Sequence, residues 1–171
     1  YQDILPKDNS AYNIVTDIEV APDGSIWGIV RGDTHILNPP WFYSHPPVYL
    51  VHYDGNSWSE YDSSWYNYGA PAKDQWERST QKSATSLAVS SDGKVWTGIS
   101  YDLEQQYAFL SVGRGISCYA NGAWINTPIG PLSYEDVFAA RRNGGKYLVS
   151  SIATAADGQV WISTAGAGIF Q

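Results

Sequence analysis

Few residues of this 171-residue chain have the side chains and spacing that catalysis or metal binding would require. His35, His45 and His52, with Asp33 and Asp54 nearby in the sequence, carry side chains that ligate metal ions. Their spacing matches no metal-site template, and His52 falls in an expected strand. We therefore expect ordinary surface or core histidines, with no metal ion and no other cofactor.

Three Asp-Gly pairs, which begin at Asp23, Asp92 and Asp157, could serve catalysis only if they converged on one site. Because each lies at the same point of a repeated segment, we expect them to be turn residues. The chain contains no Gly-x-Ser-x-Gly, no His-Glu-x-x-His and no phosphate-binding glycine loop. We therefore expect no catalytic residues. A lyase or hydrolase whose catalytic groups come from distant loops is the alternative.

Aromatic side chains gather in two segments that we expect to be loops, 32–47 and 62–83. The candidate binding residues are Trp41, Phe42, Tyr43, Trp65, Tyr66, Tyr68 and Trp76. Indole and phenol rings can stack on sugar rings or anchor a protein contact. They can equally cover outer strands as a small satellite core. The sequence leaves these three interpretations open.

The charge and composition of the chain exclude several classes of partner. With 10 Lys and Arg and a net charge of −7, we expect no nucleic-acid partner, because phosphate binding needs a basic surface. No apolar run is long enough for a membrane-spanning helix. Cys118 is the single cysteine, so no intramolecular disulfide can form, and we expect a buried, inert thiol. The chain begins at Tyr1 and has no Met, which indicates a processed or excerpted product.

An internal repeat indicates the elements that position these residues. Segments 16–27, 85–96 and 150–161 align without gaps, and each ends in Trp after an Asp-Gly pair. Each predicts a β-hairpin, in which an alternating strand leads to an Asp-Gly turn with positive φ angles. The second strand is apolar on both faces, as in a strand buried on both sides.

A weaker motif recurs half a repeat later, at 51–58 and 117–124, where a strand, a Gly turn and a Trp follow one another. Each repeat therefore predicts four antiparallel strands, the content of one propeller blade. We expect a single all-β domain over 1–171. Its blades are expected at about 13–62 and 84–127, with an incomplete third at about 148–171.

The segment 152–169 resembles the two-component-regulator type of propeller repeat. In that family an apolar strand, an Asp-Gly turn, an apolar-Trp pair and a Gly-Thr-x-x-Gly-apolar segment recur in each blade. The first two repeats depart from this pattern after the Trp, where Ile29-Val-Arg-Gly-Asp and Gly98-Ile-Ser-Tyr open into long insertions. The resemblance implies a propeller fold and is poor evidence for function.

Propellers close with four to eight blades, so about three blades leave exposed strand edges and uncovered apolar faces. We expect these to be completed by copies of the same chain, as a ring or a filament, or by the rest of a longer propeller. A compact fold of another kind is a third possibility. The expected assembly edge comprises Gly166, Gly168, Ile169 and Phe170.

The sequence therefore predicts a non-enzymatic propeller module that acts by protein contact. We expect an extracellular or cell-surface setting, with the periplasm as a variant, and a homo-oligomer as the assembled form. A sensor or carbohydrate-binding propeller with a glycan ligand is the first alternative.

Overall fold

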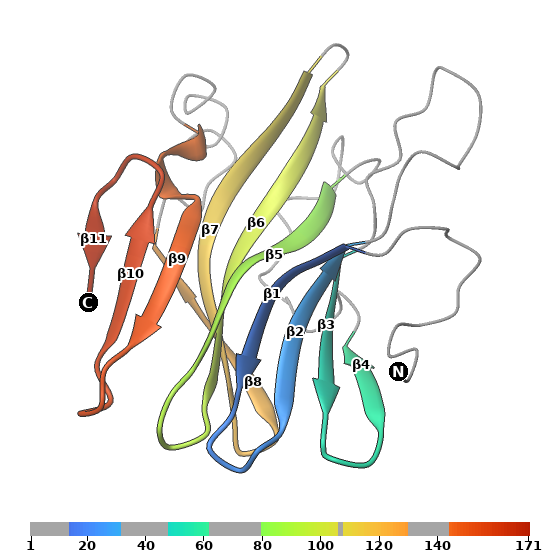
Figure 1. Ribbon diagram of the computed structural model, residues 1–171. Coiled ribbons are helices and arrows are strands. Elements are labelled where there is room, and N and C mark those ends of the chain that lie inside the picture. The colour runs from blue at the N-terminus through green and yellow to red at the C-terminus, as the bar shows by residue number, and fades with distance from the viewer. Residues whose placement is uncertain (1–13, 32–47, 62–79, 106–107, 130–143) are drawn as a thin grey trace, which may run out of the picture.

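Three antiparallel sheets follow one another along the chain in the computed structural model (Figure 1). The structure describes residues 14–31, 48–61, 80–105, 108–129 and 144–171. Within these ranges the regular structure consists of eleven strands and one short 3-10 helix. The all-β class expected from the repeat is confirmed.

Each strand pairs with the strand that follows it in the same sheet. The first sheet has the order β1-β2-β3-β4 and contains β1 (Ile14–Val20), β2 (Ile26–Arg31), β3 (Val48–Tyr53) and β4 (Trp58–Tyr61). The second has the order β5-β6-β7-β8 and contains β5 (Thr80–Val89), β6 (Val95–Gln105), β7 (Ala108–Ala120) and β8 (Ala123–Pro128). The third has the order β11-β10-β9 and contains β9 (Val149–Thr154), β10 (Val160–Thr164) and β11 (Ile169–Phe170), preceded by the 3-10 helix η3 (Gly144–Tyr147).

The first hairpin of every sheet turns at its Asp-Gly pair, as the repeat predicts. In the first sheet the Gly24 N–H donates to the Ala21 carbonyl at 2.9 Å, and the Ala21 N–H donates to the Ser25 carbonyl at 2.8 Å. Equivalent pairs of bonds close the other two hairpins. The positive φ falls on the glycine alone, at 84°, 80° and 86° in Gly24, Gly93 and Gly158. A three-residue hairpin loop, in which a type I turn is followed by a left-handed glycine, has this geometry.

The second sheet differs from the prediction where an insertion was expected after Gly98. The strand β6 continues to Gln105, and β7 begins at Ala108, so that the two strands form one long hairpin. Apolar and polar residues alternate from Ile99 to Leu103, a pattern typical of a strand. Alternation therefore extends the sheet here, and β5 likewise begins at Thr80, inside the second expected loop.

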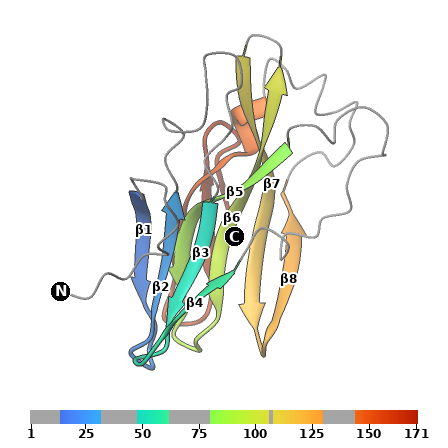
Figure 2. The same cartoon turned by 90° about the vertical axis from the view of Figure 1, so that its right-hand side faces the viewer.

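The sheets pack face to face in series, so the second sheet lies between the first and the third (Figures 1 and 2). The first strands of successive sheets are neighbours, with β1 beside β5 and β5 beside β9. Two hydrogen bonds join these first strands. The Leu87 N–H donates to Asp17 Oδ2 at 2.8 Å, and Thr154 Oγ1 donates to the Val89 carbonyl at 3.1 Å.

Two apolar cores fill the spaces between the sheets. The core between the first and second sheets contains Ala21, Trp27, Ile29, Leu50, Ala84, Leu87, Val95 and Ile99. The core between the second and third sheets contains Ala88, Ile116, Val149, Ile152 and Ile162. The strand β6 therefore contributes Val95 to one core and Trp96 to the edge of the other. This double burial explains why its sequence is apolar on both faces.

Candidate functional site

The seven aromatic residues predicted to bind a ligand lie outside the described residues, as do Asp33, His35 and His45. In the described ranges, no three His, Cys, Asp or Glu side chains are grouped closely enough to hold a metal ion. His52 lies in β3, as expected, with its ring stacked on that of Trp27 at a centroid distance of 4.2 Å. Burial lowers its pKa, although Asp23 and Asp54 act in the opposite direction. His52 therefore belongs to the packing between the first two sheets.

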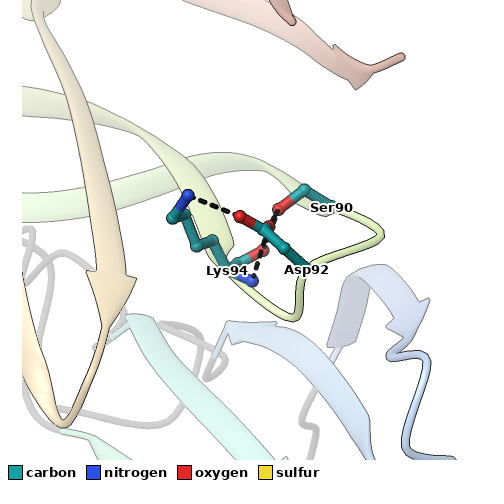
Figure 3. A network of polar contacts seen from close by, with 3 residues as sticks. All are labelled: Ser90, Asp92 and Lys94. Carbon is teal, nitrogen blue, oxygen red and sulfur yellow. Dashed lines mark hydrogen bonds and ion pairs between the residues drawn. The ribbon is translucent and has the colours of Figure 1, made fainter. Parts of the chain in front are cut away.

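The repeated aspartates bind within their own turns. Figure 3 shows the second turn, in which the Asp92 carboxylate accepts hydrogen bonds from Ser90 Oγ and from Lys94 Nζ. These bonds lower the pKa of Asp92 to about 2, the bond from Lys94 having the largest effect. Asp23 Oδ1 and Asp157 Oδ1 each accept a backbone N–H two residues further on, at 2.9 and 3.1 Å. The three carboxylates cap separate hairpins, as predicted.

Cys118 is buried in β7, as the sequence predicted, on the face of the second sheet that points toward the third. Burial raises the pKa of its thiol. A thiol that is both buried and protonated at neutral pH lacks the thiolate that nucleophilic chemistry needs.

The clearest candidate for a binding surface is the pair of sheet faces at the two ends of the series, which none of the described sheets covers. We call the face of each sheet that points toward the next sheet in the chain its leading face, and the opposite face its trailing face. The repeated Trp lies on the leading face in every sheet. Trp27 is 4% exposed beneath the second sheet, whereas Trp161 on the third sheet is 43% exposed.

The trailing face shows the same contrast at the other end of the molecule. Leu87 and Ile152 occupy equivalent positions on the trailing faces of the second and third sheets, and both are buried. Their counterpart on the first sheet, Ile18, is 60% exposed, and Val20 beside it is also exposed. The same position is therefore covered inside the series and open at its end.

A row of apolar side chains crosses the open trailing face of the first sheet. Directly paired residues on the four strands form it, in the order Val20, Ile26, Tyr53 and Trp58. The Tyr53 and Trp58 rings stack at a centroid distance of 5.0 Å. We call these four residues the apolar row, and with Ile18 they form what we call the open trailing face. Ile18 and Val20 are exposed there, Ile26, Tyr53 and Trp58 are partly buried, and Val30 and Val51 on the same side of the sheet are buried.

The open leading face lies on the third sheet and includes part of the expected assembly edge. Ile169 pairs with Ser163 on the same face as Trp161 and is 71% exposed. Phe170 points the other way and packs against the core between the second and third sheets. The tight turn before β11 contains Gly166, which lies close to Lys146, and Gly168, which has a φ of 98°.

Neither a comparison with protein-family models nor a search of the curated proteins gives a match to this chain. Among the described residues, no helix is long and apolar enough to cross a membrane.

Sequence reasoning identified the uncovered faces only in general, and it missed the residues that form them. It placed Trp161, Ile18 and Val20 among the strand residues of the repeat without distinguishing them from their inner counterparts. The position of each sheet in the series could have identified these residues. Among the described sheets, the leading residues of the third and the trailing residues of the first have no neighbouring sheet to cover them.

Proposed function

We propose that this chain is a non-enzymatic propeller-type module that works by protein contact and associates with copies of itself through its open sheet faces and the edge of β11. The observation that carries the proposal is the exposure of apolar residues at the ends of the series whose equivalents inside it are buried or partly buried. Trp27 and Trp161 are the clearest such pair. We place the assembled protein outside the cell or at a cell surface.

The energetics of apolar burial support association at these faces. Fully burying a large apolar side chain stabilises a protein or complex by roughly 1.5–3 kcal/mol. Ile18, Val20, Trp161 and Ile169 are all exposed and lie on the two open faces. Exposed apolar patches of this kind are typical of protein-contact sites. The free edge of β11 adds backbone groups that another strand could pair with.

Sedimentation velocity of the 171-residue chain over a wide concentration range tests this function. We expect concentration-dependent association that Ile169→Lys weakens by about tenfold or more. Ile125→Lys is the matched control, because Ile125 is an exposed apolar residue of β8 that lies on neither open face. A chain that remains monomeric at every concentration would contradict the proposed function.

A further inference from the structure

We propose that copies join head to tail, with Trp161 of one copy seated on the apolar row of the next. This inference rests on the proposed self-association and names the surfaces that meet. A joint of this kind is heterologous, because each copy contributes a different face to it.

The contact between the first and second sheets provides the template for this joint. On the trailing face of the second sheet, directly paired residues form a row of Val89, Val95, Tyr119 and Trp124. The leading face of the first sheet packs onto this row. The Trp27 ring lies 5.6 Å from that of Tyr119, and the Tyr61 ring lies 6.2 Å from that of Trp124.

The apolar row of the first sheet repeats this template strand by strand. Val20, Ile26, Tyr53 and Trp58 stand where Val89, Val95, Tyr119 and Trp124 stand in the second sheet. The Tyr and Trp rings are separated by 5.0 Å in both rows. One row receives a Trp from the sheet before it. The other has no sheet before it in the described part of the chain.

Trp161 is the residue that fits the apolar row of another copy. It occupies on β10 the position that Trp27 occupies on β2, paired with the first strand of its own sheet. Its neighbours on the open leading face are uncharged, and they include Ser151, Ala153, Ser163 and Ile169. Packing this face onto another copy therefore buries no charged side chain from that side, which lowers the desolvation cost of the contact.

A mixing experiment tests the head-to-tail joint. Trp161→Arg blocks the open leading face, and Val20→Lys blocks the open trailing face. Both positions are exposed, so we expect both variants to keep the melting temperature of the unsubstituted chain. Each variant alone should associate about tenfold or more weakly than the unsubstituted chain. An equimolar mixture should form a one-to-one dimer, because each variant retains the face that the other lacks. Ile18→Lys provides a second trailing-face variant if Val20→Lys unfolds.

The outcomes separate this inference from the proposed function. A one-to-one dimer in the mixture, with both single variants monomeric, supports the head-to-tail joint. If the unsubstituted chain associates and both variants associate equally well, the joint lies elsewhere, and the inference fails while self-association stands. If both variants are monomeric and their mixture is too, the two faces do not meet each other. If the unsubstituted chain is itself monomeric, the inference and the proposed function fail together.

Discussion

At the scale of single residues, hydrogen bonds from Lys94 and Ser90 couple the ionisation of Asp92 to folding. Its folded pKa of about 2 lies below the ordinary value of 3.8, so its contribution to stability is complete above about pH 4. That contribution is lost as the pH falls from about 4 toward 2. We therefore expect the free energy of unfolding of Asp92→Asn to fall less steeply with acid than that of the unsubstituted chain. Urea unfolding at a series of pH values would measure both slopes.

Lys94→Gln provides the control for this prediction. It removes the ion pair but leaves the hydrogen bond from Ser90 to the Asp92 carboxylate. Its acid slope should lie between those of the unsubstituted chain and Asp92→Asn. Equal slopes in all three proteins would show that the turn in Figure 3 does not couple folding to pH.

His52 gives a pH dependence in a higher range. Its folded pKa lies below the ordinary value of 6.5, because burial disfavours the charged ring. As the pH falls through 6.5, the unfolded chain binds the proton first, and stability decreases. We expect His52→Gln to remove this part of the decrease, as measured by thermal unfolding between about pH 8 and pH 5. An unchanged decrease in the variant would contradict the stacked, half-buried position of the ring.

Residue roles in the turns could be predicted from the sequence, whereas the exposure of the repeated residues could not. Asp23, Asp92 and Asp157 cap their hairpins because a local Asp-Gly geometry requires it. The exposure of Trp161 depends instead on whether another sheet covers it, which the local sequence does not determine. The same limit applies to Ile18.

On the scale of elements, Gly98 of β6 lies directly against Val149 of the third sheet. A Cβ at this position would collide with Thr85 Oγ1 and would lie 2.7 Å from the Cβ of the buried, branched Val149. We expect Gly98→Ala to destabilise the protein by about 1–3 kcal/mol, because the third sheet must shift away from the second. Denaturant unfolding measures this loss.

Gly28→Ala is the matched control on the equivalent strand of the first sheet. The added Cβ would lie 3.3 Å from Val51 Cγ2 and would meet no other sheet. We expect a smaller loss of stability than for Gly98→Ala. If Gly28→Ala destabilises the protein as much as Gly98→Ala, the close approach of the two sheets is not the cause.

The sequence predicted the strands correctly where the apolar residues that indicate them lie inside the repeated segments. It predicted β1, β2, β9 and β10 with their turns, because apolar residues recur there in a strand pattern around Asp-Gly. It failed at the long β6–β7 hairpin, because comparison with the third repeat favoured an insertion after Gly98. Residues 99–105 form a strand because they pair with β7. This pairing depends on the sequences of both strands, and comparison with the third repeat does not reveal it.

For the whole molecule, the order in which the sheets pack determines which apolar faces have a neighbouring sheet. The second sheet contributes to an apolar core on each of its faces, and the first and third sheets each contribute to one of these two cores. The sequence predicted uncovered faces because three repeats do not close a propeller. The proposed contact between Trp161 of one copy and the apolar row of the next could be inferred only from the register of the strands.

The net charge of −7 on each copy predicts how salt affects association. Like-charged copies repel, and salt screens this repulsion over a Debye length of about 10 Å at 0.1 M. An apolar joint gains nothing from ionic contacts. We therefore expect association to strengthen as sodium chloride is raised from roughly 0.05 to 0.5 M, as measured by light scattering. Association that weakens with salt would indicate an ionic joint and contradict the apolar one.

Electron cryomicroscopy of the native particle would show which surfaces of neighbouring copies meet. We expect particles in which the third sheet of one copy packs face to face on the first sheet of the next, in rings or in filaments. Trp161 should lie over Tyr53 and Trp58 of the neighbouring copy, as Trp27 lies over Tyr119 within the chain. Separate monomers, or copies joined through surfaces other than these two faces, would contradict it.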